Sequence, residues 1–298
     1  MNIISAENLT KFYGKSRGIV DVNLAVGKGD IFGFIGPNGA GKSTTIRTLL
    51  GLIAPSSGKA EIFGKDIKTN KLEILSNVGF LPSETMFYSG MRVSEILKLS
   101  ANLHRKDCTA EAKSLCERLS LDPTRKIDEL SLGNRKKVGI VCALQHKPSL
   151  YILDEPTSGL DPLMQREFYS LLIERNNDGA TVFLSSHILS EVQKYCKHAA
   201  VIRDGNILVN DSVEKLGQTG AKRVILHGVN KVPELDGQKI LSVTDNSVEF
   251  LYSGDIRQLT NLLASLPLTD FTVTEPDLEE IFMHYYTKEG AAHDDFSA

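Results

Sequence analysis

The sequence predicts an α/β fold in which helices cover both faces of a mostly parallel sheet. Strands alternate with helices over residues 31–63 and 150–209, and this alternation is typical of parallel sheets with helices on both faces. Between these segments, residues 91–145 have helical periodicity only, which predicts a helical subdomain inserted at about residues 84–147. From residue 216 onward, short strands joined by Gly and Asn turns predict a separate small α+β domain over residues 216–288. The first domain is therefore expected to span residues 1–215.

The elements of the first domain follow from apolar periodicity and from turn residues. Apolar residues predict strands at residues 3–4, 20–26 and 31–35, and a helix over residues 43–52. The Ala-Pro-Ser-Ser-Gly turn at residues 54–58 is expected to end this helix. The chain then predicts a strand at 59–63, helices within 91–120 and 131–145, a strand at 150–153, a helix at 162–174, a strand at 181–184, a helix at 187–196 and strands within 199–209.

The second domain is predicted to be antiparallel. Strands are expected at residues 224–226, 240–243, 248–251 and 271–274, with a helix at residues 256–266 before the last of them. Pro276 suits the first turn of a final helix, and Thr274 can cap it. The apolar stripe of that helix would be Leu278, Ile281, Phe282 and Tyr285. The polar tail, residues 289–298, is predicted to be disordered.

The composition is that of an ordinary globular protein, with 41% hydrophobic and 24% charged residues and a net charge of −3. This charge gives no support to bulk binding of nucleic acid or acidic lipid. The four cysteines are scattered without a Cys-x-x-Cys pair, which predicts reduced thiols and no zinc site. The N-terminus lacks the pattern of a signal peptide, and no apolar stretch approaches the ~18 residues needed to span a bilayer.

The strongest functional signal is the segment GPNGAGKST at residues 36–44, between a predicted strand and a predicted helix. It matches the phosphate-binding loop pattern Gly-x-x-x-x-Gly-Lys-Ser/Thr, so the core is predicted to be a P-loop NTPase. The backbone N–H groups of the loop and the helix N-terminus favour phosphate. Lys42 is placed to reach the β- and γ-phosphates, and the Ser43 hydroxyl to ligate Mg²⁺. The loop residues expected to bind nucleotide are Gly36, Pro37, Asn38, Gly39, Ala40, Gly41, Lys42, Ser43 and Thr44.

A second group of polar residues follows two predicted strands. The segment LYILDE at residues 150–155 ends in two acidic residues, Asp154 and Glu155. Asp154 is expected to hold Mg²⁺ together with Ser43. Glu155 lies where ligands of open α/β sheets bind, and it is expected to polarise a water for attack on the γ-phosphate. His187 is expected to begin the helix after the next strand and to face the same phosphate. Upstream, LSLGN at residues 130–134 precedes a helix, whose N-terminus is suited to bind an anion.

In this order, the phosphate loop, the Ser-x-Gly helix start, the LDEPTSGLD stretch and the SSH triplet resemble an ATP-binding subunit of an ABC transporter over about residues 2–215. The resemblance implies a dimer with two ATP molecules between its subunits. It implies adenine stacking for Tyr13, Mg²⁺ binding for Asp154, the role of catalytic base for Glu155 and γ-phosphate contact for His187. The residues implied to reach the other subunit or its nucleotide are Ser131, Gly133, Asn134 and Asp161.

Two positions depart from the family pattern. The family segment LSGGQ reads LSLGN here, so that Leu132 adds bulk and Asn134 has a shorter amide side chain. A family glutamine that senses the metal and the attacking water is replaced by Ser83, which is followed by Glu84. Ser83 is expected to reach Mg²⁺ through water.

The resemblance implies ATP hydrolysis that energises transport through a separate integral membrane permease. Such a partner would hold this chain at the cytoplasmic face of the membrane, and residues 83–97 are a candidate docking surface. The C-terminal pattern Thr-x-Pro-x-Leu-Glu-x-x-Phe resembles a subgroup that powers bacterial export of drugs, antimicrobial peptides and related amphipathic molecules. The second ATP-binding subunit would be an identical or a sister chain, and no nucleic-acid partner is expected.

Three other functions begin from the same phosphate loop. An ATPase that acts on DNA or ribosomes would need coiled-coil arms or two ATPase cassettes, and the sequence has one cassette without sustained heptads. A module that only holds ATP would lack Lys42 or Glu155, which are both present. A nucleotide kinase would leave LDEPTSGLD and LSLGN unexplained.

Overall fold

The computed structural model describes residues 2–217 and 222–274. The chain divides into two compact units, Met1–Asp211 and Ser212–Ala298. Each unit buries a hydrophobic cluster of its own, so each is described by itself.

A six-stranded sheet forms the centre of the first unit, with the strand order β10-β9-β3-β8-β7-β6. The pairs β6–β7, β7–β8, β8–β3 and β3–β9 are all parallel. Every residue of β3, β7 and β8 is buried, which explains why apolar residues follow one another in these strands without alternating with exposed polar residues. The predicted α/β fold is confirmed. The strands are β3 (Ile31–Ile35), β6 (Val78–Leu81), β7 (Leu150–Asp154), β8 (Thr181–Ser186), β9 (His198–Arg203) and β10 (Asn206–Ser212).

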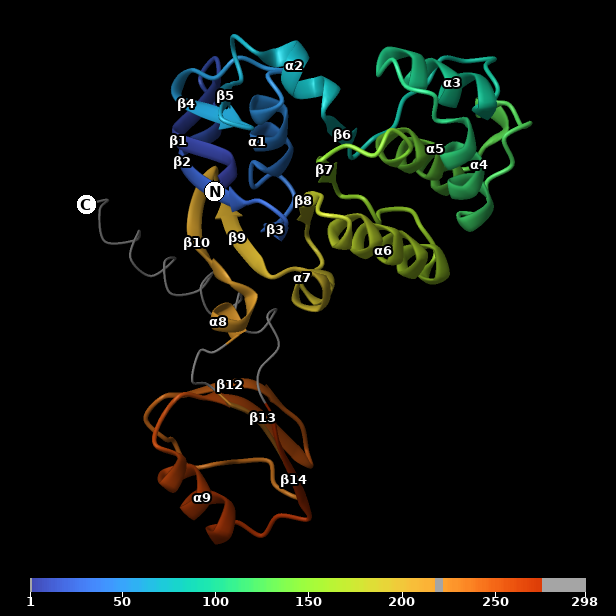
Figure 1. The fold of residues 1–298 in the computed structure, drawn as a ribbon. Helices are drawn as coiled ribbons and strands as arrows, with labels where there is room; N and C mark the ends of the chain where they lie inside the picture. The colour runs from blue at the N-terminus through green and yellow to red at the C-terminus, as the bar shows by residue number, and fades with distance from the viewer. Residues whose placement is uncertain (1, 218–221, 275–298) are drawn as a thin grey trace. The chain divides into compact units, whose positions relative to one another are not determined.

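A second sheet in this unit is antiparallel, with the order β2-β1-β4-β5 (Figure 1). It consists of β1 (Asn2–Tyr13), β2 (Ser16–Gly27), β4 (Ser57–Ile62) and β5 (Lys65–Asp66). The sequence predicted only short pieces of β1 and β2 and did not assign them to a sheet of their own. Four register shifts between β1 and β2 interrupt the alternation of apolar residues, so the full length of these strands was not visible in the pattern.

The helical subdomain is one group of helices in the first unit (Figure 1). Helices α3 (Val93–Leu103), α4 (Thr109–Arg118) and α5 (Leu132–Leu144) gather together, and both α3 and α4 pack on α5. A short 3₁₀ turn, η1 (Ile127–Glu129), precedes α5. Arg118 of α4 pairs with Glu167 of α6 (Nε to Oε1, 2.6 Å) and ties this group to the remaining helices. Those helices are α1 (Lys42–Leu49), α2 (Lys71–Ser76), α6 (Pro162–Asn177) and α7 (Leu189–Tyr195).

Three predicted helix boundaries are wrong. Helix α6 runs to Asn177, three residues past its predicted end at residue 174. Helix α1 ends at Leu49, three residues before its predicted end, because Gly51 adopts a left-handed conformation with φ 63°. Helix α7 begins at Leu189, so His187 lies in the turn after β8 rather than at the start of the helix. The Ser186 hydroxyl accepts a hydrogen bond from the Ile188 N–H at 2.9 Å and holds this turn.

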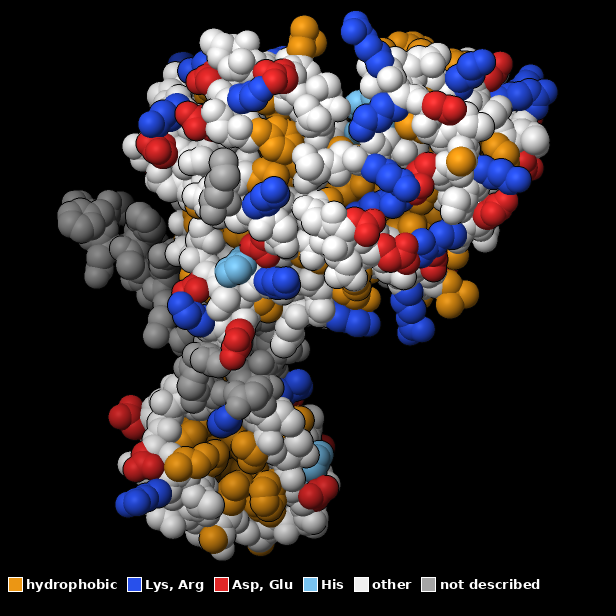
Figure 2. Space-filling view, viewed as in Figure 1, with side chains coloured by type: hydrophobic (Ala, Val, Ile, Leu, Met, Phe, Trp, Pro, Cys, Tyr) orange, Lys and Arg blue, Asp and Glu red, His pale blue; other side chains and the backbone are white. Residues whose placement is uncertain are grey.

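The second unit contains a four-stranded antiparallel sheet with the order β12-β13-β11-β14. Its elements are α8 (Val213–Gly217), β11 (Lys222–His227), β12 (Gln238–Val243), β13 (Ser247–Tyr252), α9 (Ile256–Ser265) and β14 (Asp270–Thr274). Val224 and Phe250 are fully buried against Leu259 of α9, while hydrophobic side chains also gather on the face shown in Figure 2. The predicted helix from Pro276 and the predicted disordered tail lie outside the described residues.

Candidate active site

The phosphate loop connects β3 to α1, as its pattern requires. Gly41 is the N-cap of α1 and has φ 111°, a conformation that strains any residue with a Cβ. The Lys42 side chain is buried and folds back over the loop. Its Nζ donates hydrogen bonds to the carbonyl oxygens of Gly36 at 2.6 Å and Pro37 at 3.2 Å. The ammonium group is therefore held beside the backbone that is expected to carry the phosphates.

The carboxylate of Glu155 joins the phosphate loop to the end of β8. Glu155 Oε1 lies 3.1 Å from Lys42 Nζ, and Glu155 Oε2 lies 2.7 Å from His187 Nδ1. Neighbouring strands of a parallel sheet end at the same edge, which brings these side chains together. The structure thus gathers a cation, a carboxylate and an imidazole that are far apart in the sequence.

Ser185 binds the Asp154 side chain, at the end of β7, and the backbone of Glu155, the residue that follows. Its fully buried hydroxyl donates to Asp154 Oδ1 at 2.6 Å and accepts from the Glu155 N–H at 3.0 Å. Glu155 has φ 49°, a left-handed conformation that is uncommon for a residue other than glycine. No pattern in the sequence predicts a role for Ser185 itself, although it belongs to the SSH triplet. Its role depends on the lateral pairing of Asp154 with Ser185 in the sheet.

A cavity of about 310 Å³ lies over the phosphate loop. Tyr13, Ser83 and Glu155 reach it from three separate segments, and Tyr13 is 46% exposed. Arg17 and Gly18 of β2 also line it, and no sequence pattern predicts either of them because strand pairing alone brings them there. The loop residues that line the cavity are Pro37, Asn38, Gly39, Gly41, Lys42, Ser43 and Thr44.

Lys136 is a second buried cation near the carboxylates, and no sequence motif predicts its position. It is 3% exposed, and its Nζ donates to the carbonyl oxygens of Pro82 at 3.2 Å and Ser83 at 2.9 Å. Burial lowers the pKa of Lys136 to about 8, although the charges of Asp154 and Glu155 oppose this shift. Lys136 thus links α5 to the loop that carries Ser83.

The segment LSLGN lies outside this cavity and begins α5. The Ser131 hydroxyl caps the helix by accepting from the Asn134 N–H at 3.3 Å. A Cβ on Gly133 would lie 2.6 Å from the Gly159 carbonyl oxygen, so close packing requires glycine here. Asp161 caps α6 in the same way, and it accepts from the Leu163 and Met164 N–H groups. Leu132 is 72% exposed, so its bulk points away from the protein core.

The candidate metal ligands are hydroxyl and carboxylate groups, the hard oxygen donors that Mg²⁺ prefers. Ser43 and Ser83 line the cavity, while Asp154 is 2% exposed at the end of β7. Over residues 2–217 and 222–274, no cluster of three or more His, Cys, Asp or Glu side chains is arranged to hold a metal. This donor set fits an ion that takes one or two protein ligands and completes its shell with water and substrate phosphates.

The comparison with known protein families assigns the class. Residues 19–158 match the family model described as ABC transporter. The chain is 37% identical over 298 residues to the bacitracin transport ATP-binding protein BcrA of Bacillus licheniformis, covering 94% of this chain and 96% of that protein. The chain therefore belongs to the ABC transporter family. It is an ATP-binding subunit with ATPase activity, the kind of subunit that works with a membrane permease.

Other relatives and solved structures agree with this class. BcrA of Enterococcus faecalis is 34% identical over 223 residues, covering 74% of this chain and 72% of that protein. A solved structure of an ATP-binding subunit of an ABC transporter is 29% identical, covers 72% of this chain and 91% of that chain, and has a TM-score of 0.67. A dimeric ATP-binding cassette bound to ADP and Pi shares the fold at 23% identity, with a TM-score of 0.64 over 70% of this chain and 98% of that chain. None of the helices in the described parts of the chain has the length and apolar character needed to cross a membrane.

Proposed function

We propose that the cavity over the phosphate loop binds ATP and that the residues around it hydrolyse the γ-phosphate. Tyr13 would stack on the adenine, and the loop N–H groups and Lys42 would bind the phosphates. The observation that carries this proposal is the chain of contacts from Lys42 through Glu155 to His187 beside that loop. A phosphate anion would compete with Glu155 for the Lys42 ammonium, since both are anions at the same cation.

Mg²⁺ fits the oxygen donors at this site. Ser43 would hold it directly, and Asp154 and Ser83 would hold it through water. When bound, Mg²⁺ would neutralise charge on the phosphates. Glu155 would accept a proton from the attacking water, and His187 would orient Glu155 and contact the γ-phosphate. Ser185 holds the Asp154 carboxylate and the Glu155 backbone in place through the two hydrogen bonds described above.

We propose that two ATP-binding subunits close around two ATP molecules. Ser131, Gly133 and Asn134 at the start of α5 would face the nucleotide held by the other subunit, and Asp161 would lie at the seam. Three features support this arrangement. Ser131 and Gly133 lie at a helix N-terminus, which favours an anion. Both residues lie outside the ATP cavity of their own chain, and Leu132 between them is exposed. The second subunit would be an identical chain or a sister chain.

We propose that the chain binds a membrane permease at the cytoplasmic face of the membrane and energises export of an amphipathic drug or peptide. The names of the two bacitracin transport relatives support this cargo class, and so does a 29% identical relative, the linearmycin resistance ATP-binding protein LnrL of Bacillus subtilis, which aligns over 95% of this chain and 97% of its own length. ATP binding and hydrolysis would belong to residues 1–215, with the helical subdomain at about 84–147, and residues 216–288 would form the small second domain.

The decisive experiment is Glu155→Gln. The amide keeps the shape of the side chain but cannot accept the proton, so ATP turnover should fall by a factor on the order of 10²–10⁴. ATP should bind and hold two subunits together, which size-exclusion chromatography with ATP would detect as a dimer. Glu129→Gln, an exposed carboxylate in η1, is the matched control and should keep wild-type turnover. Full turnover by Glu155→Gln, or a monomer at saturating ATP, would contradict the proposal.

A further inference from the structure

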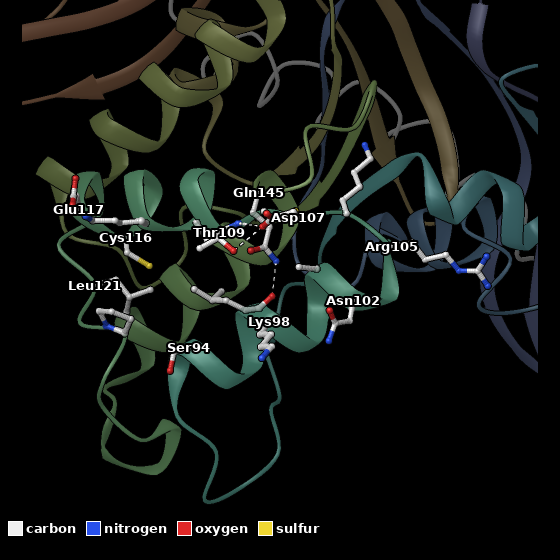
Figure 3. A pocket seen from close by; sticks show the side chains of 17 residues that line it. Ser94, Lys98, Asn102, Arg105, Asp107, Thr109, Cys116, Glu117, Leu121 and Gln145 are labelled. Atoms are coloured by element: carbon white, nitrogen blue, oxygen red, sulfur yellow. Dashed lines mark hydrogen bonds between the residues drawn. The ribbon is translucent and has the colours of Figure 1, made fainter.

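A cavity of about 960 Å³ lies between α3 and α4 (Figure 3). None of the residues that line it lines the phosphate-loop cavity. Its size is in the range of sites for drug-sized ligands, about 300–1,000 Å³. The proposed ATPase mechanism makes no use of it.

The cavity follows from the way in which three helices pack. Residues 94, 97, 98, 101, 102 and 105 form one stripe of α3 and the turn after it, and residues 109, 112, 113, 116 and 117 form one stripe of α4. Both helices pack on α5, so the two stripes face each other across a gap. The inner wall of this gap is apolar and buried, and it is made by Leu97, Ala101, Cys108, Cys116 and Leu121.

The two thiols in this wall are apolar groups. Burial raises the pKa of Cys116 to about 11 and also raises the pKa of Cys108. Both thiols are therefore protonated at neutral pH, and they act as small hydrophobic side chains rather than as nucleophiles.

Gln145 supplies a polar anchor in the wall, directly after the last residue of α5. It is 2% exposed, and its Nε2 donates to the Leu97 carbonyl oxygen at 3.0 Å. This bond fixes the orientation of the amide. The other amide atom, Oε1, is buried and accepts no hydrogen bond from the described residues. A buried acceptor without a donor is unfavourable, so a ligand N–H or O–H would be stabilised here.

Positive charge predominates among the lining residues. Lys98 of α3 and Lys113 of α4 are exposed, and neither forms an ion pair within the described parts of the chain. Lys106 and Arg105 add two further cations, against two acids, Asp107 and Glu117. The Asp107 carboxylate is already engaged by the Thr109 N–H at 3.0 Å and the Thr109 hydroxyl at 2.7 Å. This balance favours an anionic group on the ligand.

We propose that this cavity binds a small anionic amphipath that carries a hydrogen-bond donor within its apolar body. The apolar body lies between α3 and α4, its donor bonds to Gln145 Oε1, and its anionic group pairs with Lys98 and Lys113. In Figure 3 the Gln145 side chain lies near Asp107 and Thr109, and the Cys116 side chain lies near Leu121. None of these three contacts involves a residue that lines the phosphate-loop cavity.

Two fluorescent probes test the three contacts on the full chain. 8-Anilinonaphthalene-1-sulfonate has an apolar body, an N–H donor and a sulfonate, and N-phenyl-1-naphthylamine is the same body without the sulfonate. Both probes are titrated with and without saturating ATP. We expect saturable binding of one probe per chain that ATP does not displace, with the sulfonate probe about tenfold tighter.

Matched variants locate the binding. Ala112→Phe fills the cavity from α4 and should weaken both probes by about tenfold or more, whereas Ser114→Phe places the same ring on an exposed position of α4 and should change neither. Gln145→Met removes the acceptor and should weaken both probes. The double change Lys98→Glu with Lys113→Glu should weaken the sulfonate probe about tenfold and leave the neutral probe unchanged.

Three results would overturn the proposal. ATP could displace the probes, which would place them at the phosphate loop. Ala112→Phe could bind them as well as Ser114→Phe does. Binding could be weak and without saturation, as expected of an open surface that contacts another protein. Circular dichroism shows whether Ala112→Phe folds. If it does not, the double lysine variant tests the proposal: a loss of affinity for the sulfonate probe but not for the neutral probe supports it, and equal affinities for both probes relative to the wild type contradict it.

Discussion

Glu155 combines an unfavourable backbone conformation with a functional position. A left-handed conformation costs a residue with a Cβ on the order of 1–2 kcal/mol. The hydrogen bond from its N–H to the buried Ser185 hydroxyl and the ion contact of its carboxylate with Lys42 offset this cost. In this conformation the carboxylate reaches the phosphate loop, where its Oε1 contacts Lys42, so the strained residue lies at the proposed site of hydrolysis.

Lys42→Ala should remove most of the affinity for ATP. The lysine is buried beside the loop, so its charge acts at reduced dielectric, and loss of a charged contact worth about 2–3 kcal/mol weakens binding by about 100-fold. Isothermal titration calorimetry with ATP measures this change. Lys59→Ala, at an exposed lysine paired with Glu7, should bind as the wild type does. Equal affinities of the two variants would contradict the role given to Lys42.

His146 joins α5 to the sheet. Its ring stacks on His104 with centroids 3.6 Å apart, and its Nε2 lies 3.3 Å from the Val78 carbonyl oxygen. Burial, together with the nearby His104, lowers the pKa of His146 to about 4. The folded chain therefore holds this imidazole neutral at pH values where the unfolded chain protonates it.

This difference predicts a loss of stability in mild acid. The pKa of His146 in the folded chain is below the unfolded value of 6.5. The contribution of the neutral imidazole to the free energy of unfolding is therefore fully present above pH 6.5 and is lost as the pH falls toward 4. Within this window the loss is at most about 1.4 kcal/mol per pH unit. Urea unfolding between pH 7 and pH 4 should show a smaller slope with pH for His146→Gln than for the wild type. An unchanged slope would contradict the assignment, and His227→Gln in the second unit is the control.

At the scale of elements, the start of α5 depends on close packing against the loop after β7. The Gly133 Cα faces the Gly159 carbonyl oxygen, and a methyl group there would be 2.6 Å from it. The contact is with backbone, so relief requires a shift of the helix start itself. That shift would move Ser131 and Asn134, which form the helix cap.

Gly133→Ala should therefore destabilise the first unit by about 1–3 kcal/mol and lower ATP turnover by more than tenfold. Thermal unfolding and a phosphate-release assay measure the two effects. Leu132→Ala, at the exposed neighbour, is the matched control and should leave the stability nearly unchanged. Wild-type stability of Gly133→Ala would show that the loop at Gly159 moves freely, contrary to this packing.

For the whole molecule, the two units are stabilised by separate hydrophobic cores. In the first unit the Phe183 ring lies 5.8 Å from Phe32 and 5.5 Å from Phe34, between centroids. In the second unit Phe250 is fully buried on the sheet against α9. Units with separate cores are expected to unfold as separate cooperative units.

Phe250→Ala should lower the stability of the second unit by about 3–5 kcal/mol and leave ATP affinity unchanged. Calorimetry should show two unfolding transitions. The midpoint temperature of the second unit should fall, whereas that of the first unit, which ATP raises, should not change. Phe183→Ala is the matched change in the first core and should lower the ATP-dependent transition instead. A parallel fall of both transitions in Phe250→Ala would contradict separate cores.

The sequence by itself determined the fold class and the phosphate loop, because these depend on short, contiguous patterns: buried apolar strands, a glycine turn, and Lys42 with Ser43 at fixed spacing. It also located Glu155 and His187, since both follow predicted strands. Only the tertiary structure decided the separate antiparallel sheet, the place of His187 before α7, and the roles of Ser185 and Lys136. These features arise from lateral strand pairing and helix packing between distant segments, and no local pattern of residues records such contacts.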